Sequence, residues 1–196
     1  MKILRTLRLA ALMLGIVSTL TLSAKAQTSD WAIDSAHSGI QFEIRHFGVS
    51  NVRGSFSKIT GTVKLDDKDV TKSSVQATIP TSTVNTNEDK RDGHLKGGEF
   101  FNVEKYPTMT FKSTSIKRVN GKLQMSGDLT LVGVTKPVIL EVDGPAAPQK
   151  GMGGKMLSGL SASGVIKRSD FGFGSKYGPP MLGDEVKFTI DIEMTK

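Results

Sequence analysis

The chain has 196 residues, a net charge of +7 at pH 7 and no cysteine. Without cysteine it can form no disulfide, and it offers no thiolate to a metal ion. Its length suits a single domain that buries its own core.

The N-terminus has the layout of a secretory signal peptide. Three cations among the first eight residues precede an apolar run at 9–22, and Ala24 and Ala26 supply the small residues of a cleavage site. We therefore predict a signal peptide over residues 1–26, a single mature domain over 27–196, and a periplasmic or secreted location. The apolar run is short for a membrane span, so we predict no stable membrane insertion.

Cleavage also removes much of the positive charge. Four of the 26 basic residues lie in the leader, which leaves 22 basic and 19 acidic residues and a net charge of +3. So small an excess, without a dense basic run, argues against nucleic acid as a partner.

The first predicted strand lies at 40–46. Ile40, Phe42, Ile44 and His46 alternate there with polar residues, which is the period-two pattern of a half-buried antiparallel strand. One face of this strand is therefore expected to point into the protein and the other into solvent.

The next apolar pattern, at 52–65, changes phase. Its apolar positions are even up to Phe56 and odd from Ile59 onward, so an extra residue near Ser57 and Lys58 predicts a β-bulge. A bulge bends a strand, and a small closed barrel needs such bends.

Strand signals and turns continue to the C-terminus. A helical turn is predicted around 88–95, and Asn120-Gly121 is a strong hairpin signal. The other predicted elements are strands at 75–79, 109–111, 123–131, 138–142, 160–166 and 185–194, a turn at 133–137, a loop at 144–154 and an irregular stretch at 170–183.

About eight such strands with frequent glycines predict an all-β fold. Periodicity alone does not choose between a barrel and a sandwich. An eight-stranded barrel can be filled by side chains or can hold one small ligand.

The sequence lacks recognisable catalytic motifs. Residues 159–163 approach a nucleophile elbow but end in serine. Gly153-Gly154-Lys155 is followed by Met156, where a phosphate-binding loop needs Ser or Thr. We therefore predict neither an enzyme nor a bound cofactor.

The three histidines are His37, His46 and His94, and their spacing matches no metal motif. We predict no metal site, and we assign His37 and His94 to hydrogen bonds that tie down loops. His46 is either a hydrogen-bonded core residue or a polar group at a barrel mouth. Arg168, at a strand end, either forms a salt bridge or pairs with a phosphate or carboxylate.

Several short motifs follow one another along the mature chain. They are Trp31-Ala32-Ile33-Asp34, Ala36-His37-Ser38, Asp92-Gly93-His94-Leu95-Lys96, Glu99-Phe100-Phe101, Tyr106-Pro107-Thr108-Met109-Thr110-Phe111, Gly127-Asp128-Leu129-Thr130, Gly133-Val134-Thr135-Lys136-Pro137, Arg168-Ser169-Asp170-Phe171-Gly172 and Gly183-Asp184-Glu185-Val186. Together they resemble the YceI-like family of periplasmic polyisoprenoid-binding proteins. The family usually shows Asn before the arginine, where this chain has Lys167.

The resemblance implies an extended, eight-stranded antiparallel lipocalin-like β-barrel with a short helical insertion. It also implies a long hydrophobic pore that holds isoprenoid or acyl chains. Some members are dimers, so a homodimer is one assembly that the resemblance allows.

The residues expected to line such a pore are inward positions of the alternating strands. They are Ile40, Phe42, Ile44, His46, Phe56, Val63, Met109, Phe111, Leu123, Met125, Leu129, Leu140, Phe188 and Ile190. His46 and Arg168 are the candidate head-group contacts. Without the resemblance, the same apolar residues would fit a filled, dry core equally well.

We therefore expect a protein that binds and carries or stores a long-chain apolar lipid in the periplasm, such as a polyisoprenoid, an isoprenoid quinone or a fatty acyl compound. The alternative is an envelope-stress or protein-interaction module with a filled barrel, whose loops at 144–154 and 170–183 bind a protein.

Overall fold

The computed structural model describes residues 28–196, so the predicted signal peptide lies outside the described residues. The strands are β1 (Thr28–Ile33), β2 (Gly39–His46), β3 (Ser50–Phe56), β4 (Thr60–Asp66), β5 (Ser74–Pro80), β6 (Thr108–Val119), β7 (Lys122–Leu131), β8 (Val134–Asp143), β9 (Gln149–Lys150), β10 (Met156–Lys167) and β11 (Leu182–Thr195). The α-helix is α1 (Asp89–Lys96), and short 3-10 turns are η1 (Val70–Lys72), η2 (Thr81–Thr83), η3 (Met152–Gly154) and η4 (Arg168–Phe171).

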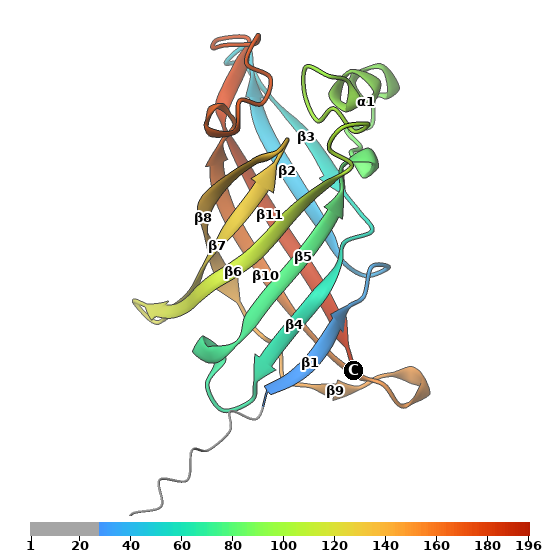
Figure 1. Ribbon diagram of the computed structural model, residues 1–196, viewed down its shortest axis with the longest axis vertical. Coiled ribbons are helices and arrows are strands. Elements are labelled where there is room, and N and C mark those ends of the chain that lie inside the picture. The colour runs from blue at the N-terminus through green and yellow to red at the C-terminus, as the bar shows by residue number, and fades with distance from the viewer. Residues whose placement is uncertain (1–27) are drawn as a thin grey trace, which may run out of the picture.

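The sheet closes on itself through β11. One edge of β11 pairs with β10 from Leu157↔Thr195 to Lys167↔Glu185. The other edge pairs with β2 over 182–191 and with β1 at 194–195. β1 and β2 thus share one position of the barrel, and β3 and β4 share the next, while β9 only extends the edge of β10. The predicted eight-stranded antiparallel barrel with one short helix is confirmed (Figure 1).

Alternation along the strands decides which side chains face the interior. In β11, Val186, Phe188 and Ile190 are inward, while Lys187 and Thr189 between them are exposed. Successive side chains of a strand point to opposite faces, so a period-two sequence pattern becomes an apolar interior and a polar wall.

The phase change near Lys58 is a break between β3 and β4 rather than a bulge within one strand. Lys58 adopts a φ of 57°, and Phe56 and Ile59 on either side of it are both buried. The extra residue lets both strands keep their apolar side chains inside, which is the effect that the sequence predicts for a bulge.

The predicted hairpin at Asn120 and Gly121 joins β6 to β7. Their φ values of 50° and 81° are both positive. A tight type I′ hairpin turn requires positive φ at both central residues, and Asn followed by Gly tolerates this best.

The helix α1 stands at one end of the barrel, within the insertion between β5 and β6 (Figure 1). Its N-terminus is capped by Glu88, whose carboxylate accepts hydrogen bonds from the backbone N–H groups of Lys90 (3.2 Å) and Arg91 (2.6 Å). The helical turn expected at 88–95 is thus confirmed. No helix within residues 28–196 combines the length and apolarity that a membrane crossing demands.

Three further local expectations are wrong. The period-two pattern predicts the first strand at Ile40 and misses β1, whose first three residues are all polar. The turn expected at 133–137 is confined to its start, because β8 already begins at Val134. Pro137 is tolerated in β8 because β10 pairs with that strand only at residues 141–143, which leaves one edge unpaired. The loop expected at 144–154 contains β9 and η3.

Trp31 is the largest side chain with no solvent exposure, at 0%. Its indole nitrogen donates to the hydroxyl of Ser29 at 2.9 Å, and the ammonium of Lys196 lies 4.6 Å from the centre of its ring. It therefore closes the end of the barrel opposite α1.

We expect Trp31→Ala to lower the free energy of unfolding by about 3–5 kcal/mol, because it opens a large cavity in packed core. Urea unfolding followed by circular dichroism measures this loss. Ile139→Ala is the control, since Ile139 is exposed and its change should stay within about 0.5 kcal/mol. Equal stability of the two variants would show that this end of the barrel is not a packed plug.

Candidate functional site: an apolar cavity with one polar end

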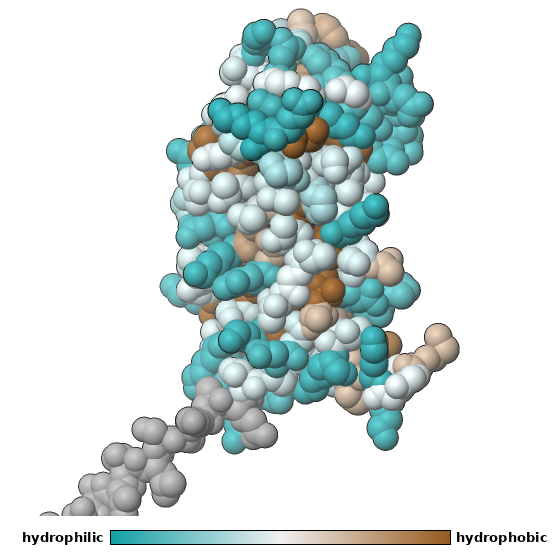
Figure 2. All heavy atoms as spheres, turned by 45° about the vertical axis from the view of Figure 1, so that its right-hand side comes forward, coloured by the Kyte–Doolittle hydropathy of each residue, from teal (hydrophilic) through white to brown (hydrophobic). Residues whose placement is uncertain are grey.

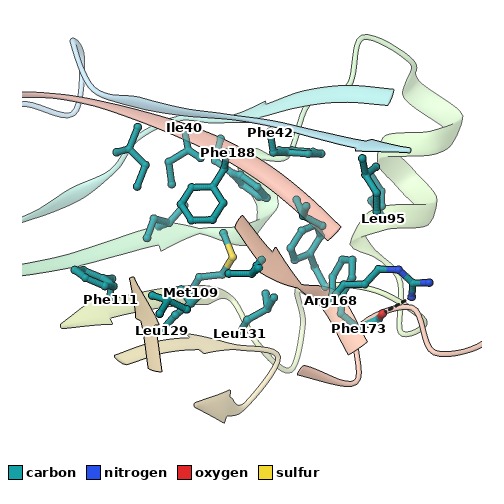
Figure 3. Close-up of a pocket in the computed structure, with 18 of the residues that line it drawn as sticks. Ile40, Phe42, Leu95, Met109, Phe111, Leu129, Leu131, Arg168, Phe173 and Phe188 are labelled. Carbon is teal, nitrogen blue, oxygen red and sulfur yellow. Dashed lines mark hydrogen bonds between the residues drawn. The ribbon is translucent and has the colours of Figure 1, made fainter. Parts of the chain in front are cut away.

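The closed barrel is hollow. It encloses a cavity of about 580 Å³, a volume within the range of sites that hold small-molecule ligands. Figure 3 shows Ile40, Phe42, Phe111 and Phe188 projecting into the space between the strands. These side chains are only half-buried although they face inward, because the cavity leaves part of their surface open.

The cavity runs along the strands from the α1 end of the barrel and ends before it reaches the opposite end. On β11, Phe188, Ile190 and Ile192 line the cavity, but Met194 lies beyond it and is fully buried. In the same way Leu65, beyond Val63 on β4, is buried outside the cavity wall. Trp31, Leu65 and Met194 thus form a packed floor.

Among residues 28–196, polar side chains line the cavity only at the opposite end. They come from the end of β2, the start of β3, the insertion 81–107 and the segment 168–181, which all lie at the α1 end of the barrel (Figure 1). These residues are His46, Ser50, Thr86, Arg91, His94, Arg168 and Tyr177. The cavity is therefore amphipathic along its length, with a polar mouth and an apolar body and floor.

Arg168 is buried and anchors the loop that follows β10. Its five N–H groups all donate to backbone carbonyls: Nε to Gly183 (2.8 Å), Nη1 to Phe173 (2.9 Å) and Gly174 (2.8 Å), and Nη2 to Leu182 (3.1 Å) and Tyr177. Burial lowers the pKa of its guanidinium, and nearby Asp184 opposes that shift. No ion pair of Arg168 occurs within residues 28–196, so the expected salt bridge is replaced by carbonyl contacts.

Arg91 is the cation at the mouth that keeps unused donors. Its Nε donates to the hydroxyl of Thr86 (2.7 Å), and its Nη2 donates to the Thr86 carbonyl (2.9 Å). Asp92 holds Thr86 from the other side, accepting from its N–H at 2.8 Å. Nη1 has no hydrogen-bond partner among residues 28–196, so Arg91 is oriented by its neighbours and still presents N–H groups at the cavity wall.

A four-residue cluster, the Glu99 latch, joins the two irregular segments of the mouth. The carboxylate of Glu99 accepts hydrogen bonds from Lys176 (2.6 Å), Tyr177 (2.5 Å) and His94 (3.0 Å). These contacts, that of Lys176 above all, lower the pKa of Glu99 to about 2. Because Glu99 and His94 belong to the insertion and the other two to the segment after β10, the latch holds the mouth together.

The residues predicted to line a pore lie on the cavity wall, with one exception. Leu123 packs instead with Ile116, Met125 and Leu140 in a second core cluster, and it is absent from the lining. It points inward, as its alternation predicts, but lies near the β6–β7 turn where side chains fill the barrel. That the lining contacts a ligand stays a prediction.

The two candidate head-group residues, His46 and Arg168, differ in whether their side chains have polar groups free to contact a ligand. His46 lies at the mouth, half-buried on the cavity wall, with its ring edge-on to Phe47 at 4.7 Å. All five N–H groups of Arg168 already donate to backbone carbonyls, so none is left for a head group. Sequence reasoning misses Arg91 and Tyr177. The run around His94 and Leu95 marks the insertion that carries Arg91 but not the direction of its side chains, and Tyr177 lies in the irregular segment after β10, where no pattern marks it.

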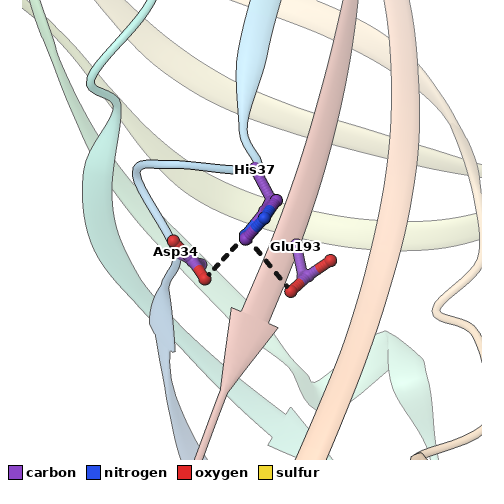
Figure 4. A group of neighbouring side chains, drawn as sticks. All are labelled: Asp34, His37 and Glu193. Atoms are coloured by element: carbon purple, nitrogen blue, oxygen red, sulfur yellow. Dashed lines mark hydrogen bonds and ion pairs between the residues drawn. The ribbon is translucent and has the colours of Figure 1, made fainter. Parts of the chain in front are cut away.

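Outside the cavity, the part of the chain that the structure describes holds one group of side chains with the spacing of a metal site. Asp34, His37 and Glu193 place one ligand atom each within 4.8 Å of the others. His37 Nδ1 lies 3.0 Å from Asp34 and 3.6 Å from Glu193 (Figure 4). The cluster ties the β1–β2 loop to β11, which is the loop-fixing role predicted for His37. His94 has the same kind of role in the Glu99 latch.

This contact should make stability weakly pH-dependent. The hydrogen bond to Asp34 raises the pKa of His37, with help from Glu193, so the stabilisation is full below the unfolded pKa near 6.5 and is lost as pH rises through the folded pKa. We expect the melting temperature of wild type to fall slightly more than that of His37→Gln between pH 6 and pH 8. Parallel pH profiles would show that the pair does not stabilise the fold.

A closed antiparallel barrel around an amphipathic cavity defines a lipocalin-like container. Residues 31–194 match the YceI-like domain. Protein YceI of Salmonella arizonae and of Salmonella enteritidis PT4 are each 38% identical over 180 residues, which cover 91% of this chain and 93% of theirs. The chain therefore belongs to the YceI-like family.

Solved structures share the barrel. The Campylobacter jejuni YceI protein superposes with a TM-score of 0.68 at 34% identity, over 76% of this chain and 86% of its own. Burkholderia cenocepacia BcnA gives a TM-score of 0.72 at 24% identity, over 82% and 98%. A polyisoprenoid binding domain from Saccharophagus degradans, implicated in plant cell wall breakdown, gives 0.61 at 16%, over 84% and 97%.

Proposed function

We propose that this protein binds a long-chain apolar lipid inside the barrel, with the chain in the apolar body of the cavity and the head group at the mouth. The observation that carries the proposal is the cavity of about 580 Å³ whose polar lining is confined to one end. The alternative interaction module needs a filled barrel, and the cavity disfavours it.

The energetics of such binding require no strong polar contact. Each buried methylene contributes about 0.8 kcal/mol, so burial of roughly ten methylenes contributes on the order of 8 kcal/mol before ordering costs. Taken alone, about 8 kcal/mol corresponds to a dissociation constant near 1 μM, and the ordering costs weaken the binding from that value. Length and apolarity of the chain would therefore set selectivity more than the head group does.

The cargo that fits best is a polyisoprenoid, an isoprenoid quinone or a fatty acyl compound. Met109 and Met125 on the wall adapt to irregular chains, and a structural neighbour is a polyisoprenoid binding domain. Family membership and the apolar lining favour a binding protein over an enzyme. With the signal-peptide pattern, they support carriage or storage of lipid in the periplasm.

We expect Phe42→Asp to reduce lipid retention at least tenfold, because it places a charge on the apolar wall. Gln41→Asp is the matched control: Gln41 is the outward neighbour on β2 and is exposed. Retention is measured by native mass spectrometry of protein secreted by its own signal, followed by solvent extraction. Ile190→Asp repeats the test on β11. A folded Phe42→Asp protein that retains lipid normally would refute the proposed lining.

At the mouth, Arg91 is the proposed head-group contact for phosphate or carboxylate, because it has unused donors where Arg168 has none. Arg91→Gln should weaken binding of a prenyl phosphate about tenfold, the loss of one charge-assisted hydrogen bond, and leave a neutral quinone of equal chain length unaffected. Competition against a fluorescent lipid measures both. Equal loss for the two ligands would mean that Arg91 only supports the insertion.

The same native mass spectra give the assembly state, so they also test a homodimer. A clean apo mass, with no uptake of added quinone or prenyl phosphate, would overturn the lipid-binding proposal.

A further inference from the structure

Exposed apolar side chains gather at the cavity mouth. Phe47 is 51% exposed, Val49 78% and Met181 42%. We call these three residues the mouth rim. Phe47 and Val49 form the tip of the β2–β3 hairpin, and the N–H of Phe47 donates to the carbonyl of Met181 at 3.0 Å, so two segments distant in sequence present one apolar surface.

The mouth rim is continuous with the cavity. Phe47 and Met181 are both exposed outward and part of the cavity lining. Apolar side chains therefore lead from the outside of the protein into the cavity, beside the polar side chains of the mouth. By contrast, the face of the barrel wall seen in Figure 2 is mostly hydrophilic or neutral, with hydrophobic residues visible mainly between hydrophilic ones.

The hairpin keeps a phenylalanine where the backbone favours another residue. Phe47 and Gly48 have φ values of 49° and 69°, and the N–H of Val49 donates to the carbonyl of His46 at 3.1 Å. This is a type I′ turn, whose first central position suits Asn, Asp or Gly. A bulky, exposed aromatic residue in a left-handed conformation is costly for folding and points to a role outside the fold.

The charges of the two segments suit a lipid surface. Residues 44–51 and 171–183 contain Arg45 and Lys176 and no acidic residue. Lys176 is paired with Glu99, whereas Arg45 donates to Gly48 and Asn51 and forms no ion pair with any residue of 28–196. An apolar tip beside a cation is the composition that attracts a protein to the interface of an anionic bilayer.

We propose that the mouth rim docks the protein on the surface of a lipid bilayer, with Phe47, Val49 and Met181 entering the interface and the cavity mouth facing the membrane. Docking at this end would let a chain pass between bilayer and cavity without crossing water. The inference goes beyond lipid binding itself, because an empty barrel would dock in the same way.

The test is co-sedimentation of the mature protein with vesicles of phosphatidylcholine and phosphatidylglycerol at 7:3. Wild type should partition onto the vesicles, and less onto phosphatidylcholine alone. Phe47→Asn with Val49→Ser and Met181→Ser should lower the partition coefficient at least tenfold. Asn suits the type I′ turn, so the hairpin should keep its fold. Val49 does not line the cavity, so Val49→Asp alone should also lower the partition coefficient.

The matched control is Ile139→Ser with Val165→Ser, which removes apolar side chains of similar exposure, 61% and 53%, from the barrel wall. Its partition should equal that of wild type. Failure of wild type to bind vesicles, equal loss in the wall control, or a rim that instead mediates a dimer seen by sedimentation velocity would each overturn the proposal. The assay needs no cargo, so its outcome is independent of the lipid-retention test.

Discussion

The pairing of β10 with β11 is the constraint on which the rest of the structure depends. It joins the two ends of the sheet along nearly the full length of both strands, so that the inward side chains face one another or the cavity. Arg168 stands at the end of this ladder, where β10 finishes, and bonds back to Gly183 near the start of β11. The residue that terminates the closing ladder therefore also fixes the loop at the mouth.

The alternating strands could be predicted from the sequence because their signal is local. The period-two pattern alone predicts that Ile40, Phe42 and Ile44 face inward. A turn at Asn120-Gly121 is predicted because Asn and Gly tolerate positive φ. Leu123 shows what the period-two pattern cannot predict. The pattern tells which face of the sheet a side chain lies on, but not how far along the barrel it lies. Whether an inward residue lines a cavity or fills it depends on partners from distant strands.

The mouth could not be predicted in the same way. Its side chains come from irregular segments, where no period applies, and their directions are set by contacts between regions far apart in sequence, such as Glu99 with Tyr177. Arg168 illustrates the difficulty. A buried arginine at a strand end suits an anion as well as a set of carbonyls, and only the fold of the following loop decides that its donors are used internally.

The packed floor formed by Trp31, Leu65 and Met194 has a kinetic consequence. A tube closed at one end admits and releases a chain by the same opening, so every buried methylene must return through the mouth before the ligand leaves. If each contributes about 0.8 kcal/mol and that energy is lost on the way out, residence time would lengthen roughly fourfold per methylene. Two lipids with the same head group would then differ in how long they stay far more than in how fast they enter.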